Sequence, residues 1–255
     1  MSNSHPARLI ARLDIKTLNV IKGIHLEGLR VVGKPAELAR RYYDAGIDEI
    51  LYMDSVASLY GRNSILDVVS EAARDIFVPL TVGGGIRTIE DIVAALRAGA
   101  DKVAINTAAI AHPQFISDAA KAVGSQAVVI SIEAQRRPGG WWEAQTNNGR
   151  EKTEIDVLKW VTEVERLGAG EIIITSIDHE GTRKGFDLEL LDEVHKRVRI
   201  PVIASGGAGN AEHVVEVFSK NVADAVACAS LFHYDLCSIG KVKEILGDNK
   251  IKVRL

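Results

Sequence analysis

The feature that most constrains this fold is an internal repeat about half as long as the 255-residue chain. Glu49 and Glu171 occupy matching places 122 positions apart. Three pairs of segments match at offsets of 122 or 123: AGIDEILYMDS (45–55) with GAGEIIITSID (168–178), VGGGIR (82–87) with ASGGAG (204–209), and GADKVAIN (99–106) with VADAVACA (222–229). The chain is therefore interpreted as two copies of one supersecondary unit.

Short runs rich in β-branched residues alternate with helical patterns in both halves, which is typical of βαβ units and a parallel sheet. Eight strands are predicted, at 8–14, 49–54, 79–83, 102–106, 127–133, 171–176, 201–205 and 224–228. Helices are predicted between them, for example at 35–46, 88–99, 153–168 and 210–220, several with Thr or Asn caps or a closing Gly. Two fused half-barrels predict a single α/β domain over residues 1–255, a (β/α)8 TIM barrel.

The one long interruption of this pattern lies at 134–152, after the fifth predicted strand. The stretch GGWWEAQTNNG predicts a hairpin inserted over one mouth of the barrel. Trp141 and Trp142 are interpreted as packing within that hairpin rather than as a platform for a ligand.

The composition excludes several classes of partner. A net charge of −3 with 47% hydrophobic residues gives no basic excess for nucleic acid or an anionic membrane. No apolar run approaches the roughly 18 residues of a membrane span, and the N-terminus has no signal-peptide stretch, so a cytoplasmic protein is expected. Cys228 and Cys237 give no disulfide framework, and the histidines show no metal-ligand spacing, so no metal and no cofactor are expected.

The first strand, RLIARLD, places Arg8, Ile10, Arg12 and Asp14 on one face. In a barrel, Arg8 then lies at the N-terminal end, where strands 2, 4 and 6 begin with Glu49, Lys102 and Glu171. Two cations and two anions entering one barrel are tolerated mainly if they pair with one another. We expect a charged ring that closes the bottom of the barrel and could admit a small polar molecule; the alternative is a set of exposed charges at strand starts.

Two carboxylates end strands that face each other across the opposite mouth. Asp14 ends strand 1 and Glu133 ends strand 5. Active sites of such barrels lie at the C-terminal ends of the strands, so these two groups are candidates for an acid and a base working on opposite sides of one substrate. The alternative is that each carboxylate caps a loop.

Glycine-rich turns follow strands 3 and 7. Backbone N–H groups in such turns, next to helix N-termini, favour phosphate. The first cradle comprises Gly84 and Gly85 with Asn106 and Thr107, and the second comprises Gly206 and Gly207 with Ser230. Two cradles related by the repeat predict a substrate with a phosphate at each end, although tight strand-to-helix turns would also use these glycines.

The loop after strand 6 adds polar groups to the same mouth. The sequence TSIDHEGTRKGFD contains Thr175, Asp178, Glu180 and Thr182, and Asp54 is the repeat mate of Asp178. Lys22, in NVIKG after strand 1, is predicted on a flexible loop that closes over a doubly phosphorylated ligand.

The whole chain resembles the cyclase subunits of imidazole glycerol phosphate synthase. The matching segments are LDIK...VIKG, LEGLR, VGGGI, GADKVAINTAA, GSQAVV, AGEIIITSID, GT..G.D and IASGGAG. The resemblance implies a lyase and cyclase that takes ammonia from a glutaminase subunit docked at the N-terminal face. It implies that a bisphosphorylated aminoimidazole carboxamide ribonucleotide is converted to imidazole glycerol phosphate and a second ribotide. Asp14 and Glu133 then stand at the catalytic positions, and Arg8, Glu49, Lys102 and Glu171 form an ammonia gate.

Four positions differ from the pattern of that family. Arg12 stands where the family usually has Cys, Glu133 and Glu180 each replace an Asp, and Glu154 replaces a Gly. Arg12 could pair with Glu133 across the mouth or bind an anionic group of a different substrate. Two other functions therefore stay open: a paralogue that supplies ammonia for sugar amidination in surface polysaccharide synthesis, and a barrel without catalysis that docks a partner and conducts ammonia.

Overall fold

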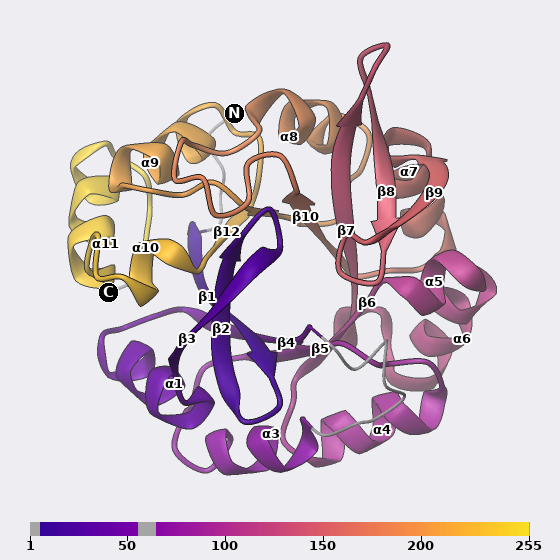
Figure 1. Cartoon of the computed structure of the whole chain (residues 1–255), viewed down its shortest axis with the longest axis horizontal. Helices are drawn as coiled ribbons and strands as arrows, with labels where there is room; N and C mark the ends of the chain where they lie inside the picture. Colours follow the sequence, from indigo (N-terminus) through magenta and orange to yellow (C-terminus); the bar gives the residue numbers. More distant parts are fainter. Residues whose placement is uncertain (1–5, 56–64, 255) are drawn as a thin grey trace.

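A computed structural model of the chain describes residues 6–55 and 65–254. Eight parallel strands of this part close into a barrel surrounded by helices (Figure 1). Hydrogen bonds link them in the order β1, β4, β5, β6, β7, β10, β11, β12 and back to β1. These strands are β1 (Arg8–Lys16), β4 (Glu49–Asp54), β5 (Leu80–Gly83), β6 (Lys102–Ile105), β7 (Val128–Arg137), β10 (Glu171–Ser176), β11 (Val202–Ser205) and β12 (Ala225–Cys228).

The helices lie outside the barrel and cover the apolar outer faces of the strands (Figure 1). They are α1 (Pro35–Asp44), α3 (Leu66–Ala72), α4 (Ile89–Arg97), α5 (Thr107–Ala111), α6 (Gln114–Val123), α7 (Val157–Leu167), α8 (Leu188–His195), α9 (Ala211–Ser219), α10 (Ser230–His233) and α11 (Ile239–Asp248), with a 3-10 turn η1 (Ser125–Ala127). The Thr88 capping box and the left-handed Gly168 are the caps expected for α4 and α7. Among the described helices, none is long and apolar enough to cross a bilayer.

The predicted barrel is confirmed, and every predicted strand is present within a few residues of its expected bounds. The helix predicted at 153–168 begins only at Val157, because residues before it form β9 (Glu151–Asp156). Asp156 caps that helix by accepting the backbone N–H of Lys159. The helical periodicity starts where β9 ends, and the prediction treated this strand and the following helix as one helix.

Each half begins with a strand that continues into an antiparallel ribbon. β1 pairs with β2 (Asn19–Ile24), which pairs with β3 (Glu27–Gly33). β7 pairs with β8 (Trp141–Thr146), which pairs with β9. The tip of the β7–β8 ribbon projects outward from the rim in Figure 1, whereas its β8–β9 turn reaches the mouth, where the Gly149 N–H donates to Glu133. Trp142 is buried in the ribbon with Arg136 over its ring, in line with the packing role expected.

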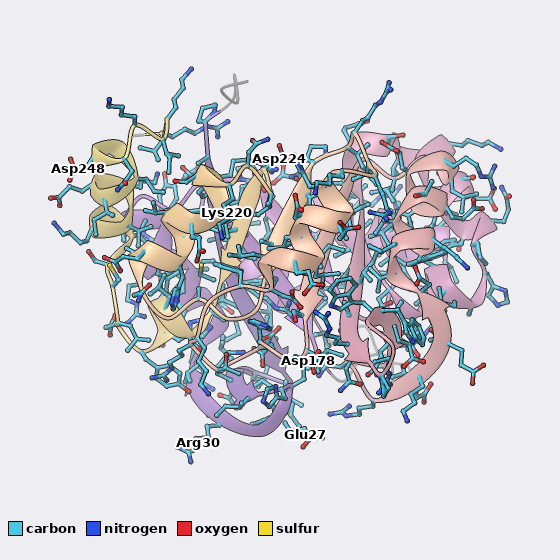
Figure 2. All side chains as sticks on the ribbon, turned by 90° about the horizontal axis from the view of Figure 1, so that it is seen from above. Glu27, Arg30, Asp178, Lys220, Asp224 and Asp248 are labelled. Atoms are coloured by element: carbon cyan, nitrogen blue, oxygen red, sulfur yellow. The ribbon has the colours of Figure 1, made fainter. Side chains whose placement is uncertain are left out.

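The barrel interior has three layers along its axis. The charged side chains Arg8, Glu49, Lys102 and Glu171 lie at the N-terminal end. An apolar layer lies above them, formed by Ile10, Leu51, Ala104, Val129, Ile173, Ile203 and Ala227, which pack with Ala225 at the level of Arg8. Polar groups, including Arg12 and Asp14, lie above that layer. Figure 2 shows the two ends edge-on, with Asp224 and Asp248 toward the N-terminal face and Glu27, Arg30 and Asp178 at the opposite one.

Candidate active site

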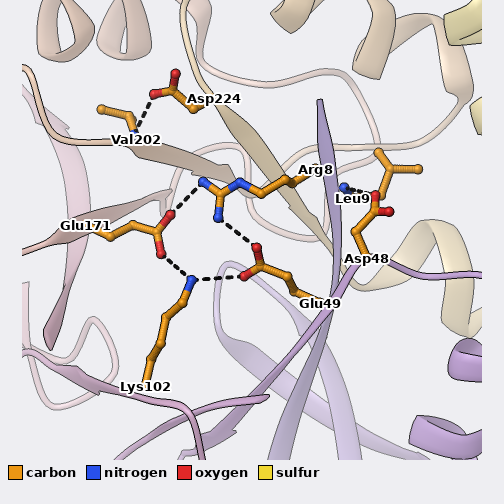
Figure 3. Close-up of polar contacts among 8 residues, drawn as sticks. All are labelled: Arg8, Leu9, Asp48, Glu49, Lys102, Glu171, Val202 and Asp224. Carbon is orange, nitrogen blue, oxygen red and sulfur yellow. Dashed lines mark hydrogen bonds and ion pairs between the residues drawn. The ribbon is translucent and has the colours of Figure 1, made fainter. Parts of the chain in front are cut away.

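The four charges at the barrel bottom form a closed ring of alternating sign (Figure 3). The Arg8 guanidinium donates to Glu49 at 2.8 Å and to Glu171 at 2.6 Å, and the Lys102 ammonium donates to the same two carboxylates at 3.1 and 2.9 Å. Burial alone would lower the pKa of Arg8 and of Lys102, but Glu171 and Glu49 outweigh burial and hold both pKa values above their ordinary ranges. Arg8 and Lys102 therefore stay protonated at neutral pH, each between the same two carboxylates.

The ring separates a cavity below the barrel from the apolar layer above it. A hollow of about 680 Å³ lies at the N-terminal face, with Arg8, Lys102 and Glu171 among its lining residues. The carboxylates of Glu49 and Glu171 are almost fully buried, whereas Arg8 and Lys102 keep 17% and 18% of their side-chain surface exposed. The cations thus face the outer hollow. The expectation of charges merely exposed at strand starts does not describe this paired ring.

Asp14 lies buried at the C-terminal mouth beside a cation of its own strand. Its Oδ1 accepts Arg12 Nε at 2.9 Å. Burial alone would raise the pKa of Asp14, but Arg12 and Lys22 outweigh it and hold that pKa below its ordinary value. His233 adds no charge here, because burial lowers its pKa to about 4. Asp14 is therefore a carboxylate at neutral pH.

Glu133 lies across the mouth in a different environment. Its Oε2 accepts Asn106 Nδ2 at 3.1 Å and the Gly149 backbone N–H at 2.7 Å. Burial raises the pKa of Glu133 to about 7, because Arg12 and the Gly149 N–H offset burial only in part. The pKa values of the two carboxyl groups are thus shifted in opposite directions, the arrangement that lets one act as base and the other as acid.

An open cavity of about 410 Å³ lies over the first cradle. Gly84, Gly85, Asn106 and Thr107 all line it, and so does Glu133. Gly84 has φ +96°, and a Cβ there would meet the Asp54 carbonyl oxygen at 2.3 Å, so the turn requires glycine whether or not it binds an anion. Arg87 and His112 also line this cavity and were not singled out from the sequence, although Arg87 directly follows VGGGI.

The second cradle is nearly closed. Gly206, Gly207 and Ser230 line a cavity of only about 20 Å³ together with Arg12, Lys22 and Glu180. A Cβ on Gly207 would meet the Gly185 carbonyl oxygen at 1.9 Å, so this turn also requires glycine. The residues predicted for the two cradles therefore line two separate cavities, one of about 410 Å³ and one of about 20 Å³.

The β2–β3 ribbon covers the second cradle. Lys22 was predicted on a flexible loop, but it lies in β2, is buried and forms an ion pair with Glu180. The Leu26 N–H donates to Glu180 Oε2 at 3.1 Å, and the His25 N–H donates to the Glu180 carbonyl oxygen at 2.9 Å. The prediction of an open loop missed the strand because Val20, Ile21 and Lys22 are buried in succession, and such a short run lacks the alternation of buried and exposed residues that identifies strands.

The remaining predicted residues divide into buried supports and rim groups. Thr175 is fully buried and accepts Arg12 Nη1 at 2.8 Å. Asp178 is exposed and accepts the Arg136 backbone N–H at 2.8 Å, which fixes the strand 6 loop to β7. Thr182 donates to the His179 carbonyl oxygen. Arg12 pairs with Asp14 rather than with Glu133, the partner considered from sequence.

Ser205 and His233 complete the mouth and were not predicted. Ser205 accepts Arg12 Nη1 at 3.1 Å, and it lies two residues after the inward-facing Ile203, so strand alternation could have identified it. His233 Nδ1 lies 2.6 Å from the Tyr42 hydroxyl, in a contact between residues 191 positions apart. No local pattern signals such a pair.

A closed (β/α)8 barrel with two oppositely tuned carboxyl groups at its C-terminal mouth has the architecture of the barrel enzymes, whose active sites lie at that mouth. Residues 8–238 match the family model described as "Histidine biosynthesis protein", and the chain belongs to that family. "Imidazole glycerol phosphate synthase subunit HisF" of Legionella pneumophila is 61% identical over 212 residues, covering 83% of this chain and 99% of that protein. The proteins of the same name from Bacillus cereus strains G9842 and Q1 are 47% and 48% identical over 248 residues, 97% of this chain and 98% of each relative. The family resemblance found in the sequence is confirmed.

Proposed function

We propose that this chain is the cyclase subunit of an imidazole glycerol phosphate synthase. In this role it uses ammonia from a glutaminase subunit to convert a bisphosphorylated aminoimidazole carboxamide ribonucleotide to imidazole glycerol phosphate. The observation that carries the proposal is the combination, in one barrel, of a sealed charged ring at one end and an acid–base pair at the other. The names of the relatives support it.

Asp14 and Glu133 supply the proton transfers. When ammonia condenses with a carbonyl carbon, its nitrogen loses two protons and the carbonyl oxygen leaves as water, and a leaving nitrogen must gain a proton when its bond to carbon breaks. Asp14, ionised beside Arg12, accepts protons from the attacking nitrogen. Glu133, with its pKa raised to about 7 by burial, delivers a proton to the leaving group.

Ammonia enters through the ring from the N-terminal face. The glutaminase docks over the hollow that contains Arg8, Lys102 and Glu171. A neutral molecule of the size of ammonia crosses the apolar layer more readily than an ion, because burying an unpaired charge costs several kcal/mol. The ring and the layer above it thus select ammonia over ammonium and hold back bulk water.

The phosphates of the substrate occupy the two cradles. The first cradle takes one phosphate in the open cavity, where Asn106 and Thr107 lie beside Glu133. The second takes the other after the β2–β3 ribbon moves, because a cavity of about 20 Å³ holds no more than a water molecule. Lys22, which moves with the ribbon, closes the site over the bound ligand.

The test uses the purified chain without a glutaminase. Ammonium salt and the bisphosphorylated ribotide are mixed with the wild-type chain, and loss of the ribotide absorbance is followed. We expect turnover, and we expect Asp14→Asn to reduce its rate by about 100- to 10,000-fold, the range for loss of a general base. Glu27→Gln, which removes an exposed carboxylate at the same face, is the matched control and should leave the rate unchanged.

Binding of the glutaminase should survive Asp14→Asn, because Asp14 lies at the opposite end of the barrel. Near-normal turnover by Asp14→Asn would remove this residue from the chemistry. No turnover by a folded wild-type chain would instead favour the paralogue that passes ammonia to a sugar-modifying system. The buried Arg12 guanidinium at the mouth is the observation behind that second candidate.

A further inference from the structure

Arg12 is a buried cation on the wall of the second cradle. It lines the small cavity there together with Gly206, Gly207 and Ser230, although it belongs to β1 on the barrel itself. Three acceptors hold its guanidinium: Asp14 at 2.9 Å from Nε, and Thr175 and Ser205 at 2.8 and 3.1 Å from Nη1. These contacts fix the orientation of the planar group relative to the cradle.

The second terminal nitrogen of this guanidinium is available to a ligand. Nη2 makes no hydrogen bond with any described residue, and it keeps some exposed surface. Part of its surface therefore faces the cavity that Arg12 lines. The Ser230 hydroxyl, on the same cavity, also makes no hydrogen bond within the described part of the chain.

Arg12 differs from the other cation at this cavity in what it is attached to. Lys22 forms an ion pair with Glu180 and belongs to the β2–β3 ribbon, which must move before a phosphate can enter. Arg12 stays in place during that movement, because its backbone is in the barrel and its side chain is bonded to β10 and β11. A cation on a rigid element is the better anchor for an anion.

We propose that Arg12 binds the substrate phosphate that enters the second cradle, through Nη2, while Nε keeps its hydrogen bond to Asp14. The inference deepens the proposed function, since it takes one phosphate of that substrate as the ligand. One planar guanidinium then joins the anion and the catalytic carboxylate, so the bound phosphate sets the distance between the substrate and Asp14. This makes Arg12 a specificity-determining residue for a ligand with an anion at this end.

The experiment measures ligand binding without turnover. The bisphosphorylated ribotide is titrated calorimetrically into wild type and into Arg12→Lys, Arg12→Gln and Arg12→Cys, with no ammonia or glutaminase present. Loss of a charged hydrogen bond predicts a Kd about 10- to 100-fold weaker for Arg12→Gln and Arg12→Cys. Arg12→Lys should recover most of the affinity. Lys16→Cys, which removes an exposed cation from the same strand, should match wild type.

A second titration separates this proposal from the proposed function. Inorganic phosphate is added to isotopically labelled chain, and the guanidinium NMR signals of Arg12 are followed, with Arg12→Lys used to assign them. If wild type fails to bind the ribotide but phosphate shifts the Arg12 signals, the proposed function fails and the anion site stands. Unchanged Arg12 signals, or equal Kd values for wild type and Arg12→Gln, would overturn the site. Equal weakening by Arg12→Lys and Arg12→Gln would assign the loss to packing and would overturn it as well.

Discussion

The two halves of the barrel share a backbone and differ at the mouth. Both begin with a strand that extends into an antiparallel ribbon, and both carry glycine turns after their third strand. The first cradle nevertheless opens into a cavity of about 410 Å³, whereas the second encloses about 20 Å³. The repeat therefore sets where the strands and turns lie, and the individual inward-facing side chains decide what each half can hold.

The same comparison explains how the pKa values of the two carboxyl groups are shifted in opposite directions. Asp14 lies opposite Met53 and Glu133 lies opposite Thr175, which are repeat mates 122 positions apart, so the two carboxyl groups occupy equivalent places. Two residues below them stand Arg12 in one half and Ser131 in the other. A cation beneath Asp14 lowers its pKa, and a hydroxyl beneath Glu133 leaves burial dominant. The unlike residues beneath the two carboxyl groups, together with Lys22 beside Asp14, separate their pKa values.

The charged ring offers the strongest test of equivalence between the halves. Glu49 and Glu171 are repeat mates, and each accepts from both cations. Glu49→Gln and Glu171→Gln should each lower the free energy of unfolding by about 3–5 kcal/mol, because each leaves buried cations underpaired. Urea denaturation measures both. The double variant should lose more stability than the sum of the single losses, since each single variant leaves both cations one carboxylate and the double variant leaves them none. A large loss for one and none for the other would show that the halves contribute unequally.

The pH dependence of stability should distinguish the equivalent carboxyl groups. Glu133 has a raised pKa, so its contribution to folding is present below its ordinary value of 4.5 and is lost as pH rises through about 7. Relative to Glu133→Gln, wild type should lose up to about 3 kcal/mol between pH 4.5 and 8. The lowered pKa of Asp14 gives the opposite sign: its contribution is present above its ordinary value of 3.8 and is lost below it. Parallel stability curves for wild type and Glu133→Gln would contradict the assignment.

The ribbon over the second cradle should open when its ion pair is weakened. Glu180→Gln removes the charge that holds Lys22 and weakens the acceptor of the Leu26 N–H. Loss of a charged hydrogen bond, about 2 kcal/mol, should make hydrogen exchange at the Leu26 amide roughly 30-fold faster. Glu27→Gln, on the same ribbon but exposed, is the control. An unchanged rate of hydrogen exchange at the Leu26 amide would mean that other contacts keep the β2–β3 ribbon closed over the second cradle.

The smallest effect is expected in the ribbon of the second half. Glu154 has φ +61°, a left-handed conformation that a Cβ disfavours. Its backbone N–H donates to Glu143 at 2.7 Å, which holds the conformation in place. Glu154→Gly should raise the free energy of unfolding by about 1 kcal/mol in thermal or urea denaturation. Gly149→Ala, at φ +73° in the neighbouring turn, should lower it. A loss of stability in Glu154→Gly would indicate that its side chain makes compensating contacts.

The barrel and its layers were predictable because their signals are periodic. Arg8 and Asp14 follow the two-residue alternation of a strand, and Glu49 and Glu171 follow the repeat. The two hydroxyl groups that accept hydrogen bonds from Arg12 were not predictable, since Thr175 and Ser205 lie 163 and 193 positions away in the sequence. The closure of the second cradle was missed for the same reason. It depends on Glu180 reaching Lys22, a contact that no local pattern announces.

The ring also bears on how the halves recognise each other. Arg8, Glu49 and Lys102 come from the first half and Glu171 alone from the second, where the places matching Arg8 and Lys102 hold Ala127 and Ala225. Two copies of the first half would meet with four cations and two carboxylates, and two copies of the second with two carboxylates and no cation. Only the pairing of one first half with one second half gives equal numbers of cations and carboxylates. If the chain were cut between them, the fragments would be expected to assemble as a heterodimer and to reject their own kind.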